Sequence, residues 1–425
     1  MGDELIILQG APAARGGLLG LSQKEPIRKR VADFKALCDK SRLGPMELPD
    51  RARQLTTTLN VLGQEWLTEA RALAGAAQVP TATFLAITSP PETVQPALLP
   101  KRANDSTSVA TSVNGAAIGA MFMENCDGPD IVHHVISRAA SPGTLAYIGL
   151  CELGDLGVKA FVNEAGLAGS FHIGPPVEDH TATPLTPTLV LRQICERATS
   201  CEQAMAEFEA LQKRMGPTTP DKRGVCYLFA DSTGEVMLLE ASATRFMYHH
   251  APEGFIITTN KFQLSKTLQT TVEPFRQRCI REYLSNGTPT LRRLVEVSRI
   301  DRKAGGEKGV CDNDTRASML CVLGAGGHPS YALVTIGTPL LNLPVPLFPG
   351  VGAARELVDD SAFTAAMRAA DAAGARVTRR AEYEQVLFER LSALNASTSK
   401  EQLGQLCQEM SKLAQQFAMM PAEKG

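Results

Sequence analysis

Long hydrophobic runs are missing from this 425-residue chain. No stretch approaches the ~18 consecutive apolar residues of a transmembrane helix, so we expect no membrane span. An excess of charge of either sign is missing too, because 43 Lys and Arg residues oppose 45 Asp and Glu residues. That balance argues against nucleic acid as a partner.

The cysteines lack any organisation that would bind a metal. The ten of them form no Cys-x-x-Cys motif and no Cys/His cluster with zinc spacing. We therefore expect buried free thiols, no metal and no cofactor. The first residues, MGDELI, contain early acids and no apolar run, so we expect no signal peptide. Together these features favour a reduced cytoplasm.

The most informative stretch of the chain reads STSVATSVNGAAIGAMFMENCD. Its Asn114-Gly115 pair predicts a two-residue type I′ turn, since both residues tolerate positive φ. The flanking segments 107–113 and 116–123 are β-branched or small and predict two buried strands. Folding the hairpin about that turn would pair Ser106 with Met123.

Asn125 and Asp127 would then lie just past the open end of this hairpin, beside Ser106. In this order, Asp105-Ser106-Thr107-Ser108 and Asn125-Cys126-Asp127 resemble motifs of the acyl-coenzyme A:isopenicillin N (6-aminopenicillanic acid) acyltransferase family. These proteins are N-terminal nucleophile (Ntn) hydrolases with the pattern Gly-Cys-Thr-Thr/Ser and then Asn-Trp-Asp. Serine therefore stands here in place of the family's cysteine. The resemblance implies self-cleavage between Asp105 and Ser106, which would give chains 1–105 and 106–425.

The chemistry explains why such residues would be needed. A serine hydroxyl is a weak nucleophile until a base removes its proton. If Ser106 becomes a chain terminus, its α-amine, with an ordinary pKa of roughly 7.7–8.0, can serve as that base. The resemblance assigns Asp127 to orient the amine and Asn260 to stabilise the oxyanion.

Further motifs follow in the family's order. The turn Asn163-Glu164-Ala165-Gly166 matches, as does Thr259-Asn260, but Lys261 stands where the family has histidine. Arg316 falls on the family's arginine and could bind a carboxylate bidentately. Local structure explains the same residues without chemistry: an Asn–Gly turn, an Asn that ends a strand, and a surface ion pair. From the resemblance we predict that four residues contact substrate: Thr107, Asn125, Lys261 and Arg316.

The implied fold is a four-layer αββα Ntn-hydrolase sandwich of two antiparallel sheets over residues 1–340, with a helical C-terminal extension. We expect helices over 26–79, a short strand over 81–87, and His172 and His180 in a solvent-facing loop. In the extension, 341–425, we expect an apolar linker and then helices. These helices would form a homo-oligomer or cover the active-site mouth, and they would carry no catalytic residue.

The function that follows is acyl transfer or hydrolysis of a small-molecule acyl-amide or acyl-thioester, such as an acyl-CoA. Water, an amine or a thiol can each be the acceptor. Two alternatives stay open: an inactive, unprocessed Ntn scaffold that binds a ligand or partner, and a helical assembly module carried on the sandwich.

Overall fold

The computed structural model of the chain describes most of its residues. The described ranges are 5–41, 46–88, 106–113, 115–128, 133–179, 185–212, 223–251, 253–265, 273–304, 307–312, 314–352 and 377–419. The turn residue Asn114, the junction residue Asp105 and His180 lie outside these ranges, as does 353–376.

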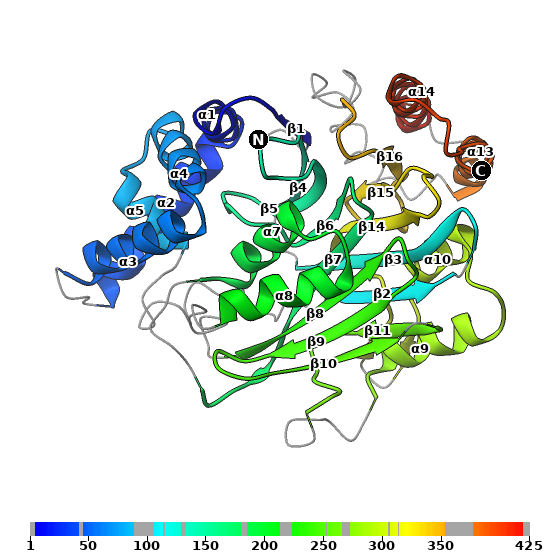
Figure 1. The fold of residues 1–425 in the computed structure, drawn as a ribbon, viewed down its shortest axis with the longest axis horizontal. Helices are drawn as coiled ribbons and strands as arrows, with labels where there is room; N and C mark the ends of the chain where they lie inside the picture. The colour runs from blue at the N-terminus through cyan, green and yellow to red at the C-terminus, as the bar shows by residue number, and fades with distance from the viewer. Residues whose placement is uncertain are drawn as a thin grey trace.

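Two sheets face each other in the centre of the molecule (Figure 1). Sheet A contains, in spatial order, β1 (Leu5–Leu8), β4 (His133–Arg138), β5 (Tyr147–Glu152), β6 (Ala160–Asn163), β7 (Leu167–Pro176), β8 (Arg223–Asp231), β9 (Val236–Ala241) and β10 (Phe246–Ala251). Sheet B contains β11 (Phe255–Thr258), β2 (Thr107–Ser112), β3 (Ile118–Asp127), β14 (Thr315–Gly324), β15 (Tyr331–Ile336) and β16 (Val345–Leu347). Neighbours pair antiparallel except β1 and β4, which are parallel, and a short ribbon joins β12 (Lys303–Ala304) to β13 (Glu307–Lys308).

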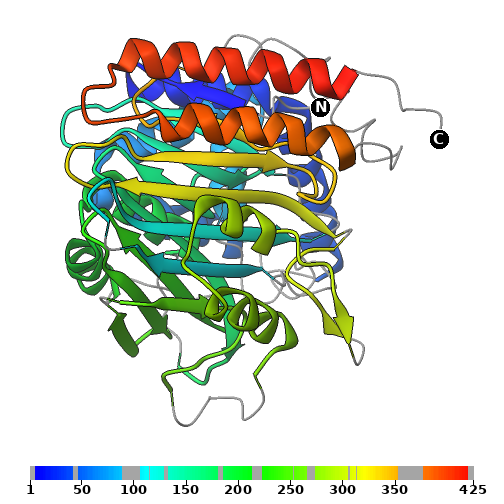
Figure 2. The same cartoon turned by 90° about the vertical axis from the view of Figure 1, so that its right-hand side faces the viewer.

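Helices cover the outer face of each sheet. On the sheet A side lie α1 (Pro12–Ser22), α2 (Lys24–Lys40), α3 (Glu47–Leu62), α4 (Gln64–Ala76), α5 (Thr81–Thr88), α7 (Pro187–Arg197) and α8 (Cys201–Gln212). On the sheet B side lie α9 (Phe275–Ser285), α10 (Leu291–Val297), α13 (Val377–Ser392) and α14 (Lys400–Met419), as Figure 2 shows. The predicted four-layer αββα sandwich is therefore confirmed.

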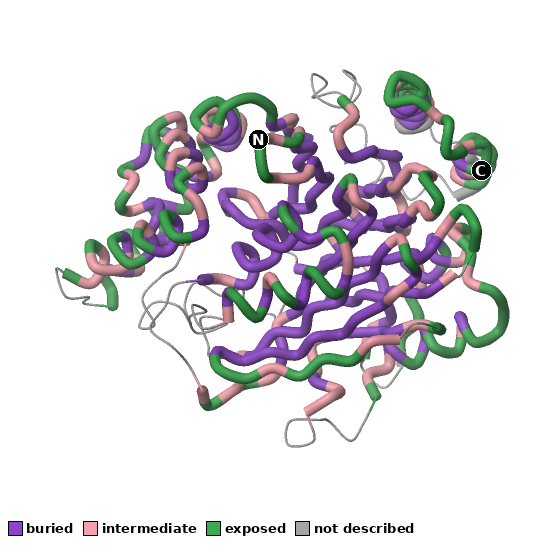
Figure 3. The backbone as a smooth tube through the Cα atoms, in the orientation of Figure 1, coloured by how far each residue is buried: buried purple, intermediate pink, exposed green. Residues whose placement is uncertain are grey.

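Strand alternation produces the two cores. Along β8, Tyr227 and Phe229 pack with the helices over sheet A, whereas Leu228 and Ala230 pack against sheet B. Both faces of the central strands are consequently buried (Figure 3). All ten cysteines are free and buried, as expected. Among the described residues, no helix is long and apolar enough to cross a membrane.

The central hairpin forms with a different register from the one predicted. Val113 N–H donates to the Gly119 carbonyl, and Ser112 pairs with Ala120, so the connection is longer than two residues. Residues 115–117 are exposed and belong to the turn rather than to a strand. As a result Met123 pairs with Val109, and not with Ser106.

Two other local predictions were wrong. The expected strand 81–87 is helix α5, since a short apolar run suits a buried helix as well as a buried strand. His172 lies in β7 and is completely buried, so it is not a solvent-facing loop residue.

The C-terminal segment is integrated into the sandwich. Within the expected linker, β16 pairs with β15 as the edge strand of sheet B. Helix α14 packs on β16, and α13 buries Tyr383 and Leu387 in the same core. The Tyr383 hydroxyl donates to the Pro344 carbonyl at 2.7 Å. These apolar side chains cover the protein's own sheet, and self-association of the helices stays a prediction.

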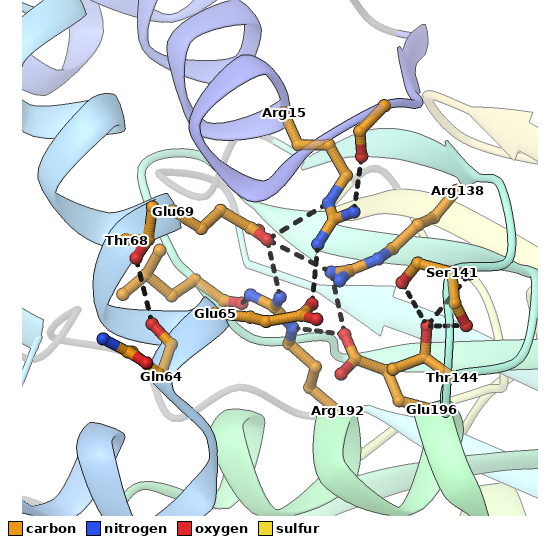
Figure 4. Close-up of polar contacts among 12 residues, drawn as sticks. Arg15, Gln64, Glu65, Thr68, Glu69, Arg138, Ser141, Thr144, Arg192 and Glu196 are labelled. Carbon is orange, nitrogen blue, oxygen red and sulfur yellow. Dashed lines mark hydrogen bonds and ion pairs between the residues drawn. The ribbon is translucent and has the colours of Figure 1, made fainter.

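A buried ion network fixes the N-terminal helices to sheet A (Figure 4). Arg15 of α1, Arg138 of β4 and Arg192 of α7 surround Glu69 of α4, whose Oε2 lies 3.5, 3.4 and 3.0 Å from a nitrogen of each. Glu196 of α7 lies 2.8 Å from both Arg138 and Arg192. All five side chains are at most 2% exposed. Although burial opposes its ionisation, the three guanidinium groups hold the pKa of Glu69 below its ordinary value.

Close packing of α1 against α4 makes this network possible. A Cβ on Gly16 would lie 2.1 Å from the Glu69 carbonyl oxygen, so a larger residue would force the two helices apart. At the rim, Glu65 lies 3.3 Å from Arg15 and is 44% exposed. The same arginine therefore contacts one buried and one partly solvated carboxylate.

Candidate active site

Four strand ends of sheet B meet at one edge of the sandwich. The last pair of β11 with β2 joins Thr258 to Ser108, and the pair Thr107–Asn125 joins β2 to β3. Beyond it, Asp127 at the end of β3 pairs with Thr315 at the start of β14. The ends of β11 and β3 thus flank the start of β2.

This register places the three predicted catalytic residues at the same edge of sheet B. Ser106 immediately precedes β2 and Asn260 follows β11 by two residues. Continuing the antiparallel register of β11 and β2 places them side by side, with the end of β3 and its Asp127 on the other flank of Ser106.

Ser106 is buried, at 1% exposure, and its hydroxyl has no hydrogen-bond partner among the described residues. Because side chains alternate along a strand, it lies on the same face as Ser108. That face is turned toward sheet A, since Ser108 contacts Ser170 of β7. The hydroxyl of Ser106 therefore lies on the interior face of the sheet.

Asp127 is held by two neighbours. Its Oδ1 accepts a hydrogen bond from Thr315 Oγ1 at 2.5 Å, and Lys308 Nζ lies 3.1 Å from its Oδ2. Burial raises the pKa of Asp127 to about 6, although Lys308, Thr315 and Arg276 oppose the rise. Lys308, on the short strand β13, was not predicted from sequence, because nothing local links it to residue 127.

Asn260 is fixed on both sides of its amide. Its Nδ2 donates to the Ile173 carbonyl at 2.9 Å, and its Oδ1 accepts from Arg276 Nη2 at 2.8 Å. The neighbouring Thr259 Oγ1 accepts from Gln277 Nε2 at 3.2 Å. Arg276 and Gln277 belong to the first turn of α9 and were missed by the sequence motifs.

The predicted substrate-binding residues divide into two groups. Thr107 and Asn125 form a buried pair on the face opposite Ser106, and Asn125 Nδ2 donates to the carbonyls of Ser298 and Val310. These bonds tie β3 to the segments on either side of the β12–β13 ribbon. The amide hydrogens of Asn125 are therefore engaged in hydrogen bonds that stabilise the fold.

Lys261 and Arg316 are both half-buried near the strand ends. Arg316 is the extra residue of an irregularity in β14, where Thr315 pairs with Asp127 and Ala317 with Cys126. Bulges of this kind redirect a side chain at the end of a ladder. The Arg316 Nε has no hydrogen-bond partner within the described part of the chain.

A second polar cluster lies deeper between the sheets. Ser108 Oγ lies 2.8 Å from Ser170 Oγ and 2.5 Å from His172 Nε2, and it also donates to Glu124. Glu124 Oε2 lies 3.0 Å from the same His172 nitrogen. All four side chains are completely buried.

Charges within this cluster depend on one another. Burial opposes ionisation of Glu124, but His172, Lys159 and Ser108 hold the pKa of its carboxyl below the ordinary value. Burial also lowers the pKa of His172, while Glu124 opposes that shift. A Ser–His–acid relay needs the serine and the acid on opposite ring nitrogens. Here both contact Nε2, so the cluster is not such a relay.

One family profile matches the middle part of the chain. The profile of the acyl-coenzyme A:6-aminopenicillanic acid acyl-transferase family matches residues 119–303. The match confirms the resemblance predicted from the motifs. The matched range contains Asp127 and Asn260 and begins after Ser106. No curated protein matches the chain.

Solved structures with a similar arrangement have low sequence identity. An N-acylethanolamine-hydrolyzing acid amidase ortholog from Caenorhabditis elegans is 16% identical, covering 51% of this chain and 92% of its own, with a TM-score of 0.35. Penicillin V acylase from Agrobacterium tumefaciens is 13% identical, covering 57% and 86%, with a TM-score of 0.38. A conjugated bile acid hydrolase from Clostridium perfringens is 12% identical, covering 57% and 92%, with a TM-score of 0.35.

Proposed function

We propose that this protein, whose sequence matches the acyl-coenzyme A:6-aminopenicillanic acid acyltransferase family, is an Ntn-type enzyme with Ser106 as its nucleophile. The family match supports acyl transfer or amide hydrolysis as the general chemistry. The position of Ser106 carries the finer assignment. It is a buried hydroxyl without a hydrogen-bond partner among the described residues, at a strand end flanked by Asn260 and Asp127.

The first step would be processing of the chain itself. Ser106 Oγ attacks the carbonyl carbon of Asp105, and the bond from that carbon to the Ser106 nitrogen breaks. The nitrogen takes up a proton, and an ester joins Asp105 to the serine side chain. Water hydrolyses the ester, leaving a carboxylate on Asp105 and a free α-amine on Ser106.

Turnover would then use the new α-amine as the base. It accepts the hydroxyl proton while Oγ attacks the substrate carbonyl carbon, and Asn260 donates a hydrogen bond to the developing oxyanion. Collapse expels the amine or thiol of the substrate, which takes the proton from the ammonium group. Water or another acceptor cleaves the acyl ester of Ser106. Ionised Asp127 would orient the ammonium group.

Cationic and polar side chains near the strand ends would bind the rest of the substrate. Arg316, placed by the β14 irregularity, suits a carboxylate because its guanidinium group can form two parallel hydrogen bonds. Lys261, half-buried after Asn260, would interact with a second anionic group. Thr107 and Asn125, on the opposite face of the sheet, would stabilise the strand ends that position Ser106.

One observation favours the alternative of an unprocessed binding scaffold. Lys308 Nζ, 3.1 Å from Asp127, already supplies the cation that the α-amine of a processed chain would supply. In that case Ser106 would never become a chain terminus, and the site would bind an acylated ligand without turning it over.

The intact mass of purified protein separates the two functions. The enzyme should yield two chains, and the larger should begin at Ser106. Ser106→Ala should remain one chain, with no turnover of acyl-amides or acyl-thioesters and an unchanged Tm. Ser318→Ala is a matched control, because Ser318 is also a buried serine of sheet B whose hydroxyl has no partner in the described ranges.

If the wild-type chain stays intact, Ser106→Cys decides between a weak nucleophile and a scaffold. Thiolates are intrinsically better nucleophiles, so cleavage by this variant would show that the surrounding groups are competent. An intact cysteine variant, or turnover that survives Ser106→Ala, would refute the assignment of Ser106.

A further inference from the structure

The first turn of α9 contacts the Thr259-Asn260 pair through two consecutive side chains. Arg276 Nη2 donates to Asn260 Oδ1 at 2.8 Å, and Gln277 Nε2 donates to Thr259 Oγ1 at 3.2 Å. Arg276 is 8% exposed and Gln277 is 4% exposed. These contacts are therefore interior ones, shielded from competition by water.

The position of this helix turn is itself fixed. Pro274 forms the N-cap, and the Phe275 N–H donates to Glu307 Oε2 at 2.7 Å. Glu307 precedes Lys308 in β13, and Lys308 contacts Asp127. One hydrogen bond thus joins the element that contacts Asn260 to the element that contacts Asp127.

Ile173 and Arg276 determine which way the amide of Asn260 points. A guanidinium group has only donors, so Arg276 can bind only the oxygen of the amide. The Ile173 carbonyl has only acceptors, so at 2.9 Å it can bind only Nδ2. A flipped amide would lose both bonds and bring donor against donor and acceptor against acceptor. The orientation of the side chain is therefore unique.

That orientation matters for the proposed chemistry. An amide stabilises an oxyanion only if its nitrogen, and not its oxygen, faces the developing charge. We propose that Arg276 is a positioning residue for Asn260: it holds the amide oxygen on the α9 side and keeps Nδ2 on the side of Ser106. This inference rests on the proposed function, because it assigns Asn260 the oxyanion.

The charge of Arg276 has a second effect, which gives an independent readout. Asp127 is faced by Lys308 and Arg276, with Asp312 on the far side of Lys308 and the thiols of Cys126 and Cys311 nearby. Arg276 lowers the pKa of Asp127. Removing the guanidinium group should therefore move the acidic limb of the activity profile to higher pH. A merely structural role would not produce this shift.

A double-mutant cycle tests the inference. Loss of one oxyanion donor typically lowers kcat by about 10²–10³, and we expect Asn260→Ala to fall in that range. Arg276→Met should lower kcat by about 10-fold or more, with KM nearly unchanged, and Arg276→Lys should restore part of it. If Arg276 acts through Asn260, the double variant should be no slower than Asn260→Ala alone, compared at a pH above the acidic limb, where Asp127 is ionised in every variant.

Arg278→Met is the matched control. Arg278 lies two residues further along α9, is exposed, and sits over the Phe275 ring. Its replacement should leave kcat, KM and the pH profile unchanged. If Arg276→Met does not fold, the same cycle run with Arg276→Lys answers the question.

Several results would overturn the inference. Multiplying effects in the double variant would show that Arg276 acts independently of Asn260. A rise in KM alone would make Arg276 a substrate-binding residue. If turnover survives Ser106→Ala, the proposed function itself fails. If turnover requires Ser106 but the cycle is additive, only the role of Arg276 fails.

Discussion

Replacing Glu69 by glutamine should strongly destabilise the folded protein. This expectation does not depend on the proposed catalytic function. Glutamine keeps the shape of the side chain but removes the charge that Arg15, Arg138 and Arg192 share at 3.0–3.5 Å. Removing one partner of a buried ion pair typically costs 3–5 kcal/mol, because the remaining charge stays desolvated and uncompensated.

The structure places Glu69→Gln at the lower end of that range. Arg138 and Arg192 would each retain Glu196 at 2.8 Å, and Arg15 would retain Glu65 at 3.3 Å. No guanidinium group would therefore lose every anion. We expect the free energy of unfolding to fall by about 3 kcal/mol.

Denaturant unfolding of both variants at pH 7 measures this loss. Glu65→Gln is the control, because Glu65 contacts the same Arg15 but is 44% exposed, and exposed pairs contribute only about 0–1 kcal/mol. The lowered pKa of Glu69 means that its contribution is present above the ordinary glutamate pKa of about 4.3 and is lost as the pH falls below it. The difference between wild type and Glu69→Gln should therefore shrink in acid. Equal, small effects of the two substitutions would refute this reasoning.

Three further outcomes are expected. Glu124→Gln should lower the free energy of unfolding by about 1.5–3 kcal/mol in guanidinium chloride, because Ser108 and His172 lose a charged, buried hydrogen-bond acceptor; an unchanged midpoint would contradict this. Protonation of Asp127, whose pKa burial raises to about 6, should steepen the decline in activity that protonation of the Ser106 α-amine begins at roughly pH 7.7–8.0. A pH–rate profile that Asp127→Asn leaves unaltered would exclude a role for this carboxylate. Deleting residues 353–425 should expose the apolar surface that α14 covers on β16 and so increase the binding of a hydrophobic dye. A soluble truncated protein with unchanged dye binding would show that the helices are dispensable for the fold.

Strand and helix positions could be predicted in part from the sequence. The β-branched and small segments located β2 and β3, and the helices expected over 26–79 are present as α2, α3 and α4. Ser106 and the end of β3 still lie at one edge of the sheet despite the error in turn length, but Asn125 and Asp127 both lie within β3 and not past the open end of the hairpin, and Asn125 lies on the face opposite Ser106. A change in turn length slides two strands past each other, but it keeps their ends at the same edge of the sheet.

The remaining features depend on partners that are distant in sequence. Glu124 and His172 come from strands of different sheets, and Arg276 reaches Asn260 only because α9 folds back on β11. No spacing rule connects such residues, since their proximity follows from sheet-on-sheet packing. The helix at 81–88 escaped prediction for another reason: eight apolar and small residues satisfy either periodicity, and tertiary burial decides between them.

The parallel pairing of β1 with β4 has a consequence for a processed chain. β1 lies before the proposed cut and β4 after it, so cleavage would make Leu5–Leu8 a strand supplied by a separate polypeptide. Before the cut, the connecting chain keeps the two parts at high effective concentration; afterwards they meet only by diffusion. The uncut protein would refold at a rate independent of its concentration, whereas the mature protein would need a bimolecular encounter to reassemble. Folding would then have to precede cleavage. The mature enzyme would stay folded because it unfolds slowly, and not because it refolds readily.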